Sequence, residues 1–311
     1  MSKEDLRNLF ISIKEDDVST VSMLVIENNW FNLRFPRFFD SNLVKQYPFF
    51  NHYPSIISVA AYFGSYDVFE FLISNSADVQ LRDENNVNAI GYAIRNSNIN
   101  IIKYLFDKES IDQPTADDCF LFASEYNSLD SFQFCLLHAQ FNPKAKNPRG
   151  RNCIHYAALH GNIELMNLLL QNGADINAMS TEGQSPLMLA AVSNNSDVVR
   201  FMLDVDGISM NLTNQFNDNA FILAAAPGRL ENMKLMIEKG FTDINHQNDN
   251  DATALHIACI NNRIDVVKYL LTLPEIDATL PDAGGMNALF RSFFLQHDEL
   301  VNILYEYLKE R

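Results

Sequence analysis

The chain of 311 residues has few cysteines and no paired ones. Cys119, Cys135, Cys153 and Cys259 lie far apart and form no Cys-x-x-Cys motif. This spacing excludes a disulfide framework and the common zinc sites. It predicts reduced, partly buried thiols in a cytoplasmic protein, with the nucleus as the alternative location.

Long apolar runs and positive charge are also scarce. Every uninterrupted apolar run is too short for a membrane-spanning helix. The start, MSKEDLRNLF, lacks the apolar core of a secretory signal. The chain carries 23 basic and 39 acidic residues, a formal net charge of −16. Because phosphate groups repel such a field, we expect neither nucleic acid nor a membrane as a partner.

A repeat organises most of the chain. Segments such as NCIHYAALHGN and TALHIACINNR share one pattern, and a small residue after their apolar triplet fixes the register. These anchor residues are Ala60, Ala93, Ala123, Ala157, Ala190, Ala224, Ala258 and Ser292. All but one of the steps between them are 33 or 34 residues, which predicts one supersecondary unit stacked many times.

Two columns upstream of the anchors predict how each unit begins. Five residues before each anchor stands a side chain that can cap a helix start: Ser55, Asn88, Asp118, Asn152, Ser185, Asn219, Thr253 and Asn287. Seven residues before six of the anchors stands a residue that tolerates positive φ: Asn86, Gly150, Gly183, Asn217, Asp251 and Gly285. A tight turn is therefore expected before each of those helices. Tyr53 and Ala116 occupy this place in the other two units, where we expect a different turn.

A second helix follows in every unit. Apolar residues recur at i, i+1, i+4 and i+5, as in 165–170, 198–203 and 266–271, and share one helical face. Only Ser131 and Asn232 break this rule. An acidic residue precedes the face in seven units, where it offsets the positive end of the helix dipole.

With CIHYAALHGNIELMNLLLQNGADIN (153–177) and TALHIACINNRIDVVKYLL (253–271), the chain resembles the ankyrin repeat family. The resemblance implies an all-α solenoid of about eight helix-turn-helix units with an N-terminal helical cap. It also implies that His155 and His256 form structural hydrogen bonds to a neighbouring turn. We predict a degenerate helix-pair cap over 1–29, an aromatic-rich insertion over 30–53 and the repeat array over 54–311.

The insertion interrupts the period and is dense in aromatic residues. It either folds over the N-terminal core or forms an exposed, peptide-like binding surface. Packing is the expectation, because apolar patches of that size are rarely exposed in monomers.

No catalytic signature accompanies the repeats. The sequence contains no GxGxxG, P-loop, GxSxG or HExxH motif, and its histidines are scattered. We therefore expect no enzyme activity, no cofactor and no metal site.

The remaining candidate is a surface. In ankyrin-like proteins the concave face is built from the turn tips and the exposed side of each first helix. The side chains that this resemblance places there, and whose types commonly anchor partners, are Tyr62, Phe63, Arg95, Tyr126, Arg149, Arg151, His160 and Phe216. The alternative is that some of them pack on neighbouring repeats. Lys144, Lys146, Arg149 and Arg151 also form a basic cluster, either a site for an acidic peptide or phosphate or a solvated loop.

These observations predict a non-enzymatic, monomeric scaffold or adaptor that binds another protein on the concave face. An inhibitory subunit of an enzyme is the alternative within the same class. A receptor for a small molecule or nucleotide is the alternative from another class.

Overall fold

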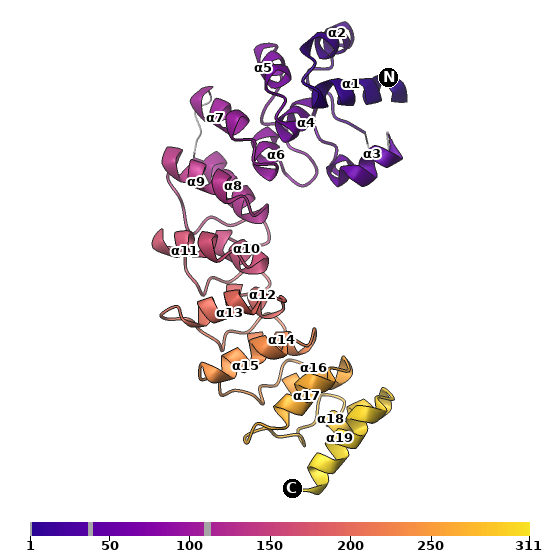
Figure 1. The fold of residues 1–311 in the computed structure, drawn as a ribbon, viewed down its shortest axis with the longest axis vertical. Helices are drawn as coiled ribbons and strands as arrows, with labels where there is room; N and C mark the ends of the chain where they lie inside the picture. The colour runs from indigo at the N-terminus through magenta and orange to yellow at the C-terminus, as the bar shows by residue number, and fades with distance from the viewer. Residues whose placement is uncertain (1, 37–39, 109–112) are drawn as a thin grey trace. The chain divides into compact units, whose positions relative to one another are not determined.

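The computed structural model describes residues 2–36, 40–108 and 113–311 (Figure 1). Within these residues the chain forms nineteen α-helices, one short 3-10 helix and no β-strand. It divides into two compact units, Met1–Asn142 (unit one) and Pro143–Arg311 (unit two). The all-α class predicted from the repeat is therefore confirmed.

Unit one consists of ten helical elements. They are α1 (Lys3–Lys14), α2 (Val18–Asn28), α3 (Ser41–Gln46), η1 (Pro48–His52), α4 (Ile56–Phe63), α5 (Tyr66–Ser74), α6 (Ala89–Arg95), α7 (Ile99–Lys108), α8 (Gln113–Glu125) and α9 (Leu129–His138). The first helices of successive pairs pack in the order α1, α4, α6 and α8, and the second helices in the order α2, α5, α7 and α9.

Unit two consists of five helix pairs. They are α10 (Cys153–His160) with α11 (Ile163–Gln171), α12 (Pro186–Ala191) with α13 (Ser196–Leu203), α14 (Ala220–Ala225) with α15 (Leu230–Glu238), α16 (Ala254–Ile260) with α17 (Ile264–Leu270), and α18 (Ala288–Phe294) with α19 (Asp298–Lys309). From α10 to α18 each first helix packs on the first helix of the next pair. Each pair thus buries its apolar faces against its neighbours in single file.

The predicted caps explain where the first helices begin. Seven of the eight residues stand at the N-cap of a first helix. The Asn219 carboxamide oxygen, for example, accepts the Ile222 N–H at 2.9 Å. The prediction is wrong for Asp118, because α8 starts at Gln113 and Asp118 lies inside that helix. Its carboxylate instead accepts a hydrogen bond from Arg82 Nη2 at 2.8 Å.

The turns before the first helices have the predicted geometry. All six residues predicted to tolerate positive φ have φ between 52° and 72°. Tyr53 also has a left-handed φ of 54°, but it ends the 3-10 helix η1, which the six other turns do not contain, so the turn there differs as expected. Ala116 lies inside α8, where no turn occurs.

In the second helices the predicted positions i and i+4 are buried, whereas position i+5 is half-buried in five units and Tyr305, in the last unit, is 55% exposed. Both polar exceptions are paired. Asn232 is 2% exposed and donates from Nδ2 to the carbonyls of Ala191 at 2.9 Å and Ser193 at 3.2 Å. The Ser131 hydroxyl is bonded to the Ser128 hydroxyl at 2.7 Å. A buried polar group with satisfied hydrogen bonds fits an apolar core at little cost.

The aromatic segment 30–53 packs onto unit one. It contains α3 and η1, and Phe35, Phe49 and Phe50 are at most 2% exposed. Its first part is tied to the start of α4, since the Phe35 N–H donates to the Pro54 carbonyl at 2.9 Å. These three rings are therefore packed inside unit one, as expected, and do not form an exposed binding surface.

Candidate partner-binding surface

The turn tips of unit two are joined edge to edge. At each step a backbone N–H of one tip donates to a carbonyl of the preceding tip, at 2.9 to 3.1 Å. The four pairs are Thr181 with Arg149, Gln215 with Glu182, Asp249 with Phe216, and Ala283 with Asn250. Because each tip holds the next, side chains on this edge are preorganised and lose little entropy when a partner binds.

A further column of residues, which we did not predict from the sequence, builds the tips. The Asn147 carboxamide oxygen accepts the N–H groups of Arg149 and Arg151, both at 3.0 Å. Asn214, Asn248 and Asp282 make the same pair of bonds in later tips. All four stand ten residues before an anchor, so the repeat register could have revealed them as turn-forming residues.

Unit two holds four of the predicted binding residues. Phe216 lies on a tip and is 57% exposed. Arg149 on another tip and His160 at the end of α10 are also exposed. Arg151 is half-buried, and its Nη2 donates to Gln184 Oε1 in the next tip at 2.8 Å. The first three are accessible to a partner, whereas Arg151 also joins two tips.

Apolar side chains accompany these residues on the first helices. Two residues after their anchors stand Leu159 on α10 and Ile260 on α16, which are 40% and 39% exposed. Val192 and Ala226 take the same place in the two pairs between them and are half-buried. We call these four residues the inner-helix row. Together with Phe216 they give unit two an accessible apolar surface beside its turn tips.

Two side chains of the basic cluster form hydrogen bonds within unit two. The Lys146 ammonium donates to the Met179 carbonyl at 2.8 Å, and Arg151 is bound to Gln184. Two of its four cations therefore link successive tips, so the cluster is only partly a solvated loop.

In unit one the predicted residues Tyr62, Phe63, Arg95 and Tyr126 are brought together by the insertion. The Phe49 ring of η1 lies 4.6 Å from the Tyr62 ring and 5.9 Å from the Arg95 guanidinium carbon. That guanidinium also lies 5.2 Å from the Tyr126 ring. Phe63 meets the Tyr47 ring at 5.1 Å. Here the chain's own segment partly covers the face that we predicted for a partner: Tyr62, Phe63 and Tyr126 are half-buried, whereas Arg95 stays exposed.

The two repeat histidines are structural, as the resemblance implied. His155 Nε2 lies 3.0 Å from the Gln184 carbonyl and His256 Nε2 lies 3.1 Å from the Met286 carbonyl, each in the next tip. A carbonyl can only accept, so each Nε2 carries the proton. Burial lowers the pKa of His155 to about 4 and also lowers the pKa of His256. Both rings are therefore neutral at pH 7, and each links its own repeat to the next one through a hydrogen bond.

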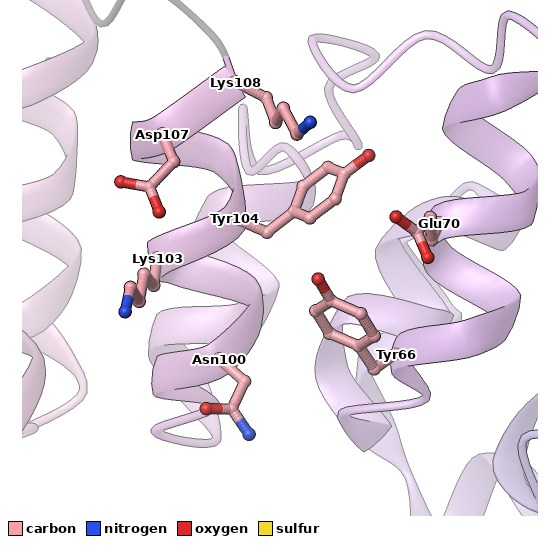
Figure 2. Close-up of a pocket in the computed structure, with 7 residues that line it drawn as sticks. All are labelled: Tyr66, Glu70, Asn100, Lys103, Tyr104, Asp107 and Lys108. Carbon is pink, nitrogen blue, oxygen red and sulfur yellow. The ribbon is translucent and has the colours of Figure 1, made fainter.

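A shallow pocket between the second helices of unit one was not predicted (Figure 2). Its volume is about 520 Å³, and it is lined by Tyr66, Glu70, Asn100, Lys103, Tyr104, Asp107 and Lys108. The Tyr66 and Tyr104 rings meet edge to face at 5.8 Å. Two lysines and two carboxylates surround them, so the lining has no dominant charge. This mixed lining selects no particular ligand class.

Two features of the described residues bear on other functions. In the part of the chain that the structure describes, no three His, Cys, Asp or Glu side chains gather in a way that could hold a metal ion. Across 2–36, 40–108 and 113–311, no helix combines the length and apolarity needed to traverse a bilayer.

Comparison with known families agrees with the stacked helix pairs. Ankyrin repeats in three copies match residues 120–214 and 221–310, and ankyrin repeats in many copies match residues 57–106. The chain belongs to the ankyrin repeat family. Domains of this kind are generally non-catalytic modules for protein interaction.

Individual relatives match only part of this chain. The chain is 35% identical over 121 residues to transient receptor potential cation channel subfamily A member 1 of Homo sapiens, covering 38% of this chain and 11% of the channel. It is 28% identical over 149 residues to L-asparaginase of Dirofilaria immitis, covering 37% and 25%. It is 34% identical over 128 residues to the E3 ubiquitin-protein ligase KEG of Arabidopsis thaliana, covering 39% and 8%. The chain thus spans at most a quarter of any of these three relatives.

Proposed function

We propose that this protein is a non-enzymatic scaffold or adaptor that binds another protein on the turn-tip and inner-helix surface of unit two. The observation that carries the proposal is the exposure of Phe216, at 57%, on a tip that its neighbours hold rigid. A large aromatic side chain that protrudes from a rigid edge is a typical anchor of a protein interface. The inner-helix row extends the apolar surface beside it.

The charge of the surface indicates the kind of partner. The tips of unit two carry Glu182, Asp218, Asp249 and Asp251, and the whole chain has a net charge of −16. A partner segment with apolar side chains flanked by lysine or arginine would complement this field. Exposed Arg149 adds one site for a carboxylate at the edge of the surface.

A capture experiment with matched variants tests the proposal. The full chain and a Phe216→Asp, Ile260→Asp variant are immobilised, and the proteins retained from a lysate are quantified. Leu137→Asp is the control, because Leu137 is 81% exposed and lies on α9 in unit one. We expect the double variant to retain its specific partner at least about tenfold less, since a buried anchor contributes about 2 kcal/mol or more to binding.

The outcomes separate the proposal from its alternatives. Equal retention by the double variant and the control would refute this surface. A partner enzyme whose activity falls upon binding would narrow the function to an inhibitory subunit. A small molecule or nucleotide that raises the melting temperature of the chain alone would favour a receptor instead.

A further inference from the structure

Three phenylalanines on α18 are largely exposed. Phe290, Phe293 and Phe294 are 62%, 69% and 67% exposed, and Leu295 next to them is 37% exposed. Positions i, i+3 and i+4 lie on one side of a helix, so the three rings form one patch. We call these four residues the α18 face.

Two residues of the α18 face correspond to positions that are buried in every preceding pair of unit two, whereas Phe294 continues the inner-helix row. Phe290 stands two residues before the anchor and Phe293 one residue after it. The equivalent residues at the first position are His155, Met188, Ile222 and His256, and at the second Ala158, Ala191, Ala225 and Cys259. Those at the first position are at most 2% exposed, and those at the second are 0% exposed. In those pairs the first helix packs against the first helix of the next pair. Phe290 and Phe293 thus lie on a stacking surface that the described residues leave uncovered, and Phe294 extends this apolar patch along the inner-helix row.

We infer that a second copy of this chain covers the α18 face in a twofold-symmetric dimer. A phenylalanine buries roughly 200 Å² when fully enclosed, so the exposed parts of the three rings amount to about 400 Å². Two copies contribute about 800 Å² of apolar area. Since apolar atoms make up about 60% of such interfaces, the total is roughly 1,300 Å². This area falls within the range of about 1,200 to 2,000 Å² that stable complexes bury.

The charge within the patch does not oppose contact between two identical faces. Arg291 is the one charged residue within α18. Its Nε donates to the buried Asp282 carboxylate at 2.9 Å, so its charge is compensated before any contact forms. The opposite end of the chain is less apolar: α1 exposes Glu4, Arg7 and Lys14. Packing the α18 face on α1 would bury those charges, whereas packing it on its own copy buries aromatic rings against aromatic rings.

Light scattering coupled to size-exclusion chromatography tests the inference on the full chain. We expect the mass to rise from 35.4 kDa toward twice that value as the concentration increases through the micromolar range. A Phe290→Asp, Phe293→Asp variant is expected to raise the dissociation constant of the dimer about 1,000-fold, because a twofold axis removes each anchor from both copies. Both side chains are exposed, so the variant is expected to keep the melting temperature of the monomer.

Two control variants keep the inference falsifiable. Phe216→Asp changes the proposed partner surface, and Met23→Asp changes an exposed residue of α2 at the other end of the chain. Both are expected to dimerise like the wild type. A constant mass of one chain up to about 100 μM would overturn the inference, because an interface of this size is populated there. Species larger than dimers, or loss of association in Met23→Asp, would also overturn it in favour of head-to-tail stacking. Failure of the dimer leaves the scaffold proposal untouched, since that proposal rests on Phe216.

Discussion

Acidification is expected to destabilise unit two through His155. Its imidazole is fully buried, and desolvation lowers its pKa from 6.5 to about 4. Between these two values the unfolded chain binds a proton that the folded chain excludes. The contribution of this ring to stability is therefore complete above pH 6.5 and is lost as the pH falls toward 4.

The size of the effect follows from the shift. One pKa unit corresponds to about 1.4 kcal/mol. Lowering the pH from 8 to 5 is therefore expected to reduce the free energy of unfolding by about 2 kcal/mol through His155 alone. His256 shifts in the same direction and adds to the loss.

Urea unfolding of three proteins at both pH values isolates the contribution of His155. In His155→Met the new side chain cannot titrate, and Met188 shows that methionine fits the equivalent position of the next pair. This variant is expected to lose about 1–3 kcal/mol at pH 8 with its hydrogen bonds, and to show a pH-dependent loss about 2 kcal/mol smaller than the wild type. His160→Met, at the exposed end of the same helix, is the control that keeps the wild-type dependence. If His155→Met and the wild type lose equal stability between pH 8 and 5, burial of this ring is not the cause.

Three further changes test how the repeats are held together, each by chemical unfolding. Gly150→Ala places a Cβ 2.5 Å from the backbone nitrogen of Thr181, so it is expected to lower the free energy of unfolding by several kcal/mol. Gly285→Ala is the control, because Gly285 has a similar φ but its Cβ would meet nothing within 4 Å. This control is expected to lower the free energy of unfolding by only about 1 kcal/mol. Equal losses would show that the contact between tips is unimportant. Asn232→Leu restores the apolar pattern yet leaves the buried Ala191 carbonyl and the partly buried Ser193 carbonyl without their donor, so a loss of about 2 kcal/mol is expected. A gain in stability would contradict that reasoning. Phe49→Ala empties a site that is 2% exposed and is expected to destabilise unit one by about 3–5 kcal/mol, whereas a loss below 1 kcal/mol would mean that the insertion is only loosely packed.

Part of the candidate surface could be predicted from the sequence. The register placed Arg149, His160 and Phe216 on tips and helix ends, and all three are exposed. The same register could not show that Tyr62 and Phe63 lie against the insertion. Their partners, Phe49 and Tyr47, come from a segment outside the repeat pattern.

The sequence by itself determined the helix pairs, their caps and their left-handed turns. These features depend on residues a few positions apart, and a repeat presents the same local evidence many times. The roles of Asn219 as an N-cap and of Gly183 as a left-handed turn residue can be predicted from their immediate neighbours alone.

Only the tertiary structure decided the features that depend on distant neighbours. The early start of α8, the hydrogen bonds of Asn232 and the packing of the insertion all involve partners that local periodicity does not specify. The α18 face is the clearest case: phenylalanine at a stacking position reads as core from sequence. These rings are exposed because no helix among the described residues packs on them. A side chain is buried only when a second surface covers it, and the sequence of one helix does not specify that surface.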